Sequence, residues 1–193
     1  MKRTISIALV LMCLCVSAYA AGDGNFEEAE MDTQQAFVLE PEVPDVPDML
    51  DVIAAAAVCA AEIEDKDVDL LARLIYSEAR GVKNRMEQAA VAWCVLNRVD
   101  SPWYPDTISA VVTQRYQFAN VSGVPVEDDL RELAMNVLFR WNMEKAGFSN
   151  VGRVLPKDYL YFWGNGKNNF FRQRHNAHVY WDWSNENPYA TEQ

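Results

Sequence analysis

The uneven distribution of charge along the chain is the feature that most limits how it can fold. Residues 21–65 contain thirteen Asp or Glu and no Lys or Arg, whereas residues 66–193 contain fifteen acidic and fifteen basic residues. The net charge of −11 therefore comes entirely from the first 65 residues. Because 193 residues, half of them apolar, can bury one substantial core but hardly two, we predict a single balanced domain over residues 66–193. An acidic linker over residues 21–65, with an alanine-rich helix at 49–61, is expected to precede it.

The first twenty residues have the pattern of a secretory signal. Lys2 and Arg3 precede an apolar run at residues 5–16, and the small-residue pattern Ala18-Tyr19-Ala20 follows it. An uninterrupted membrane span needs about 20 apolar residues, so we favour cleavage after Ala20 over a retained anchor. The expected location is then the periplasm, the cell wall or the extracellular space, with no stable membrane span left in the mature chain.

Composition argues against several classes of function. A net charge of −11 is unfavourable for a nucleic-acid binder, and four Cys and two His are too few for a disulfide-dense protein or a repeated zinc module. Acidic residues 127–129 suit the first turn of a helix better than a calcium site. We therefore expect no metal and no cofactor. Cys59 and Cys94 are expected either as buried thiols or, after export, as a disulfide.

Glu78 is the carboxylate whose position is hardest to explain by structure alone. Residues 67–81 have an acidic start and end at a glycine, which predicts a helix. At 100° per residue Glu78 falls on the same face as the apolar stripe Leu71, Leu74 and Ile75. One interpretation is a salt bridge to Arg80, Arg98 or another base. The other is a glutamate that holds a proton near neutral pH, because the apolar wall and the helix dipole disfavour its charge, and that serves as a general acid.

Periodicity predicts the remaining elements. Residues 85–98 form a helix with one apolar side, for which Asn84 is the N-cap and Glu87 completes a capping box. Residues 108–112 form a short helix, and residues 127–146 form a long one. Residues 159–172 predict a β-hairpin with its tip at Asn165-Gly166.

Four blocks of sequence resemble a known family. They are residues 70–81 (LLARLIYSEARG), 88–99 (QAAVAWCVLNRV), 116–118 (YQF) and 164–172 (GNGKNNFFR). In this order they resemble the cell-wall hydrolase family of the spore-cortex-lytic enzymes. The chain departs from the family's usual pattern at Val82, where an acidic residue is usual, and at Met86-Glu87, where Glu-Gly is usual.

The resemblance implies the fold and the activity. The implied fold is α+β and mainly α, a lysozyme-like helical domain with a small C-terminal β-hairpin. The implied activity is cleavage of peptidoglycan glycan strands, with the glutamate of the Ser-Glu-Ala-Arg-Gly block, Glu78 here, as the catalytic acid. A single carboxylate can protonate the oxygen between N-acetylmuramic acid and N-acetylglucosamine and then accept the proton of the C6 hydroxyl. We therefore favour a lytic transglycosylase.

Sugar binding requires aromatic faces and amide partners, and four residues are expected to supply them in the cleft: Gln117, Phe118, Tyr161 and Asn169. Three alternatives remain open at this point. A hydrolytic muramidase would use water in place of the C6 hydroxyl. A zinc amidase would need more ligands than His175 and His178 offer. A non-catalytic envelope protein would keep the cleft only to bind glycan.

Overall fold

The computed structural model describes residues 48–184 and residue 188. The predicted signal and most of the acidic linker lie outside these residues. The chain divides into two compact units, residues 1–56 and residues 57–193. In the first unit the described residues are 48–56, and they contain the start of helix α2 (Met49–Ala61), whose bounds match the predicted alanine-rich helix.

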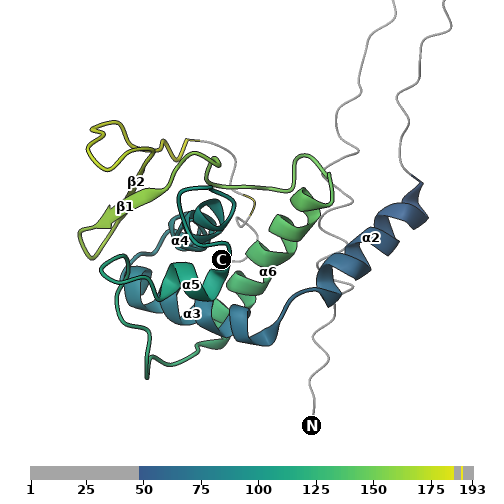
Figure 1. The fold of residues 1–193 in the computed structure, drawn as a ribbon, viewed down its shortest axis with the longest axis horizontal. Coiled ribbons are helices and arrows are strands. Elements are labelled where there is room, and N and C mark those ends of the chain that lie inside the picture. The colour runs from purple at the N-terminus through teal and green to yellow at the C-terminus, as the bar shows by residue number, and fades with distance from the viewer. Residues whose placement is uncertain (1–47, 185–187, 189–193) are drawn as a thin grey trace, which may run out of the picture. The chain divides into compact units, whose positions relative to one another are not determined.

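Three helices build the core of the second unit, as Figure 1 shows for α3 (Asp65–Ala79), α4 (Arg85–Val99) and α6 (Asp128–Lys145). α3 packs against both α4 and α6, and the short helix α5 (Ile108–Val112) packs against α3 and α4. The predicted stripe of α3 is confirmed, because Leu71, Leu74 and Ile75 are fully buried. Burial of such large side chains contributes about 1.5–3 kcal/mol each relative to exposure.

The environment of α4 differs from the prediction. The periodicity predicts one apolar side, whereas every residue from Ala89 to Arg98 is buried. A helix covered on all sides is the centre of its domain, and here α3, α5 and α6 all contact it. Its polar residues must therefore find partners inside the protein.

A two-stranded antiparallel sheet lies beside the helices (Figure 1). β1 (Tyr161–Gly164) pairs with β2 (Asn169–Arg172), and Gly164 lies opposite Asn169. The predicted hairpin is confirmed, and its loop consists of residues 165–168. Phe171 anchors the hairpin because its side chain is fully buried in the helical core. The described chain is thus mainly helical with a small sheet, as the sequence predicts.

The two cysteines of this unit are separate. Cys59 and Cys94 are both buried free thiols, so the structure does not contain the disulfide that export would permit. Burial raises the pKa of the Cys94 thiol to about 11.

No helix among residues 48–184 is long and apolar enough to span a membrane.

Candidate active site

Glu78 lies in the last turn of α3, where the buried stripe of the helix meets a pocket. Its side chain is half-buried, and its Oε1 accepts a hydrogen bond of 2.7 Å from the backbone N–H of Ala119. Among the ion pairs of the described residues, none includes Glu78. The salt bridge considered for it is therefore not formed: Arg80 lies over the ring of Tyr76, and Arg98 has other partners, described below.

The pocket beside Glu78 has a volume of about 340 Å³. It lies between the end of α3 and the tip of the hairpin, and its lining consists of Ser77, Glu78, Arg80, Gly81, Val82 and Gly166. Gly81 and Gly166 approach so closely that a Cβ atom on Gly81 would collide with the carbonyl oxygen of Gly166. Glycine is therefore required at position 81 for lack of space, and the hairpin tip forms one wall of the pocket.

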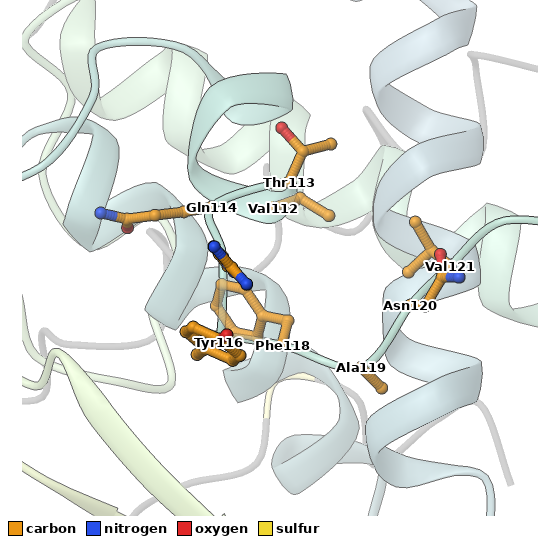
Figure 2. Close-up of a pocket in the computed structure, with 9 residues that line it drawn as sticks. Val112, Thr113, Gln114, Tyr116, Phe118, Ala119, Asn120 and Val121 are labelled. Atoms are coloured by element: carbon orange, nitrogen blue, oxygen red, sulfur yellow. The ribbon is translucent and has the colours of Figure 1, made fainter.

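The loop that contains Ala119, the hydrogen-bond partner of Glu78, forms a second hollow of about 260 Å³. Figure 2 shows Tyr116 and Phe118 near one another in this loop, with Asn120 and Val121 further along it. Tyr116 is 84% exposed and has a positive φ of 66°, a conformation that is uncommon for a residue with a bulky side chain. The same loop thus offers an exposed aromatic ring and, at Ala119, the N–H that orients the carboxylate of Glu78.

Asn169 connects the hairpin to the end of α3. Its side-chain Nδ2 donates to the backbone oxygen of Glu78 at 3.4 Å, and its backbone N–H donates to Oε2 of Glu87 at 2.7 Å. Asn169 is almost completely buried. It is not among the residues that line the pocket, and the part of it that a substrate could reach is small.

Glu87 does not form the predicted capping box. Asn84 is the N-cap of α4, as expected, because its Oδ1 accepts from the N–H of Met86 at 2.9 Å. Glu87, however, is 6% exposed, and its carboxylate accepts the backbone N–H of Asn169. Burial raises its pKa, although hydrogen bonding acts in the opposite direction. The prediction failed because Asn169 is 82 residues away, and no local pattern reveals such a partner.

Arg98 brings together the other three predicted cleft residues. Its NH1 donates to Oε1 of Gln117 at 3.2 Å, and its guanidinium lies 4.6 Å from the ring centre of Phe118 and 5.9 Å from that of Tyr161. Arg98 is 3% exposed and also donates to the backbone oxygen of Leu160 at 2.8 Å. A buried arginine on α4 thus fixes both the loop that contains Gln117 and the start of β1.

Two further groups stabilise this arrangement. Burial, together with a hydrogen bond to Tyr161, raises the pKa of Tyr104 to about 12, so the phenol stays neutral beside Arg98. Asn97 donates to the backbone oxygens of Pro156 and Tyr159 at 2.7 and 3.0 Å, and it accepts from Arg153. Residues 156–160, which precede β1, are therefore bound to α4 by Asn97 and Arg98.

The five predicted site residues thus occupy one side of the domain, in two groups. Glu78 and Asn169 lie at the end of α3, while Arg98 holds Gln117, Phe118 and Tyr161. The sequence analysis missed the organising role of Arg98, although a basic residue on the helical face of Cys94 and Val95 was a usable signal. It also missed Ala119, which orients Glu78 with its backbone N–H. A backbone contact of this kind does not depend on residue type, so the sequence does not reveal it.

Among the residues that the structure describes, no group of three or more His, Cys, Asp or Glu side chains is placed to hold a metal ion. His175 and His178 are exposed, and the ring of His175 contacts Tyr161 and Asn176.

Comparison with known proteins identifies the family. Residues 83–184 match the Cell Wall Hydrolase family, and since this is more than half of the chain, the protein belongs to that family. The match begins after Glu78. No solved structure is significantly similar to the chain.

Three curated relatives carry the name spore cortex-lytic enzyme. The chain is 38% identical over 81 residues to the protein from Halalkalibacterium halodurans, an alignment that covers 42% of this chain and 24% of the relative. It is 34% identical over 80 residues to the protein from Oceanobacillus iheyensis, covering 39% and 29%, and 29% identical over 93 residues to the protein from Bacillus subtilis, covering 46% and 30%. The chain therefore spans less than a third of the length of these relatives.

Proposed function

We propose that this protein cleaves the glycan strands of peptidoglycan between N-acetylmuramic acid and N-acetylglucosamine, with Glu78 as the acid and base. Family membership and the names of the relatives support a wall-lytic activity. The observation that carries the proposal is the half-buried carboxylate of Glu78, which lines a pocket of about 340 Å³ and is oriented by the N–H of Ala119. A pocket of this size accommodates a sugar ring.

The proposed reaction uses the two oxygens of Glu78 differently. Because Oε1 is occupied by the N–H of Ala119, we assign the proton to Oε2. That proton passes to the bridging oxygen as the bond to the anomeric carbon of N-acetylmuramic acid breaks, and the transition state acquires oxocarbenium character. The carboxylate then accepts the proton of the muramic acid C6 hydroxyl, whose oxygen closes on the anomeric carbon. The product is a 1,6-anhydro end, and Glu78 regains its proton.

We assign substrate contacts to the residues that Arg98 organises. Gln117 and Tyr116 are exposed on the loop beside Glu78, and Phe118 and Tyr161 are half-buried in contact with Arg98. The rings present flat apolar faces to sugars, and the Gln117 amide can bond to N-acetyl or hydroxyl groups. Asn169 is assigned a supporting position under Glu78, because so little of it is exposed. An exported protein would meet this substrate in the cell envelope.

Digestion of purified peptidoglycan, followed by mass spectrometry of the soluble products, tests the proposal. We expect glycan fragments that end in anhydromuramic acid, one water lighter than a reducing end, and we expect Glu78→Gln to abolish their release. Glu132→Gln, which changes an exposed glutamate on α6, is the matched control and should keep full activity.

The same experiment separates the alternatives. Reducing ends in place of anhydro ends would identify a hydrolytic muramidase, and release of free stem peptides would identify an amidase. Binding to peptidoglycan without any product, in the wild type and in Glu78→Gln alike, would contradict the proposal and indicate a glycan-binding protein.

A further inference from the structure

Glu87 is a buried carboxylate whose principal partner lies on another element. It belongs to the first turn of α4, where the helix dipole favours a negative charge. Its carboxylate accepts the backbone N–H of Asn169 at 2.7 Å. Asn169 is the first residue of β2, directly after the loop at residues 165–168. The carboxylate therefore fixes the hairpin at the point where the chain leaves the tip.

This bond is the first link of a short chain of contacts that ends at Glu78. Asn169, held at its backbone by Glu87, donates its side-chain amide to the backbone oxygen of Glu78 at 3.4 Å. On the same side, Gly164 lies against the Asn169 side chain, because a Cβ atom on Gly164 would be 2.5 Å from Oδ1 of Asn169. Gly166, two residues further, meets Gly81 and lines the pocket. The position of Asn169 thus sets both the hairpin wall and the last turn of α3.

From this arrangement we infer that Glu87 is a positioning residue: through Asn169 it places the hairpin tip against the end of α3 and so sets the shape of the pocket around Glu78. The inference extends the proposed function, on which it rests for its effect on turnover. Glu87 itself is enclosed and touches no substrate.

The acceptor at position 87 has a specific physical role. A backbone N–H that is buried without a partner costs free energy comparable to a lost hydrogen bond, and Asn169 is 2% exposed. Without an acceptor at position 87, the N–H of Asn169 must move toward water, and the start of β2 must move with it.

Two substitutions of similar size separate the acceptor from the volume of the side chain. Glu87→Gln keeps one oxygen for the Asn169 N–H, whereas Glu87→Met fills the space without an acceptor. We expect kcat on purified peptidoglycan to stay within about threefold of wild type in Glu87→Gln and to fall at least about tenfold in Glu87→Met, with a smaller change in KM. Amide hydrogen exchange at Asn169 should be at least about tenfold faster in Glu87→Met alone.

A destabilised control distinguishes positioning from general loss of stability. Val137→Ala removes buried volume from α6 and should lower the unfolding free energy while leaving kcat and Asn169 exchange unchanged. Should Glu87→Met not fold, Glu87→Leu, which also lacks an acceptor for the Asn169 N–H, replaces it with the same expectations.

The outcomes are distinct. Wild-type kcat and Asn169 exchange in Glu87→Met would overturn the inference, and so would equal losses of kcat in the Gln and Met variants. If the wild type itself releases no glycan fragments, the proposed function fails, but Asn169 exchange still decides whether Glu87 positions the hairpin.

Discussion

The end of α3 and the start of α4 each present a glutamate that accepts a backbone N–H at 2.7 Å, and the two differ in what surrounds them. Glu78 takes the N–H of Ala119 from a loop and lines a pocket. Glu87 takes the N–H of Asn169 from a strand and is 6% exposed. The same bond length therefore accompanies a glutamate that lines a pocket in one case and an enclosed glutamate in the other.

The comparison teaches that contact with a substrate-sized space, more than hydrogen bonding, decides which carboxylate can transfer a proton to a substrate. A carboxylate enclosed by protein can organise its neighbours but cannot transfer a proton to a sugar it does not reach. Only residues 80–84 separate α3 from α4, so both glutamates belong to one junction. In our proposals Glu87 positions the hairpin wall of the pocket, and Glu78 acts in the pocket that this wall encloses.

Shortening Glu78 should give the largest effect. Glu78→Asp withdraws the carboxyl group by one methylene, about 1.5 Å, and a misplacement of that order costs about 10²-fold in rate. We expect kcat on peptidoglycan to fall by this factor, while the unfolding free energy measured in urea changes by no more than about 0.5 kcal/mol. Asn169 exchange should stay at its wild-type rate. A change in exchange would mean that the two glutamates are not separable.

The helical part of this junction was predictable from sequence, but its contacts were not. Local periodicity and end signals predicted α3, α4 and α6 to within about two residues, because a helix is decided by neighbours in the chain. The partner of Glu78 is 41 residues away and that of Glu87 is 82. Both partners are backbone N–H groups, which every residue except proline has, so the sequence could place Glu78 on the right face without identifying what orients it.

The role of Arg98 was missed for a different reason. Cys94 and Val95, which precede it by four and three positions on the same helical face, are apolar, and this pattern indicates a buried position. The residues that Arg98 contacts, however, come from a loop and a strand that approach only in the folded protein. A charged group on an apolar helical face is the same kind of signal that identified Glu78, and applied to Arg98 it would have predicted the burial of this side chain.

Replacing Arg98 by lysine should give the next largest effect. Lysine keeps the charge but loses the planar group that lies over Phe118 and donates to the oxygen of Leu160. We expect a loss of about 1–3 kcal/mol in the unfolding free energy and a higher KM for peptidoglycan. Arg115→Lys, at an exposed arginine over Tyr116, is the control and should alter stability by at most about 0.5 kcal/mol. Equal effects in the two variants would contradict the organising role.

A Cβ atom at Gly81 tests the hairpin side of the junction. Exchange of glycine for alanine usually stabilises a compatible site by about 0.4–1 kcal/mol, but here the Cβ would collide with the backbone of Gly166. We expect the opposite sign, a destabilisation of about 1–2 kcal/mol, with lower kcat because the pocket wall is displaced. Lys83→Ala, at an exposed neighbour, should leave both quantities unchanged. A more stable Gly81→Ala would show that the hairpin tip yields freely.

The smallest expected effect is the pH dependence that Glu87 adds to stability. Because burial raises its pKa in the folded state above the ordinary value, the folded protein binds the proton more tightly than the unfolded chain, and folding loses stability as pH rises through the interval between the two pKa values. The contribution of Glu87 is thus favourable below its unfolded pKa and is lost above its folded one. Glu87→Gln removes this titration.

We therefore expect the difference in unfolding free energy, wild type minus Glu87→Gln, to decrease between pH 4 and pH 7 in urea denaturation. Taking the difference between the two proteins cancels the carboxylates they share, including Glu144. Burial opposes ionisation of Glu144, but its hydrogen bond and ion pair with Arg153 lower its pKa overall, so its own contribution is lost as the pH falls. A difference that grows with pH would show that the hydrogen bonds to Glu87 outweigh burial, and that the folded protein keeps Glu87 charged more firmly than a surface glutamate.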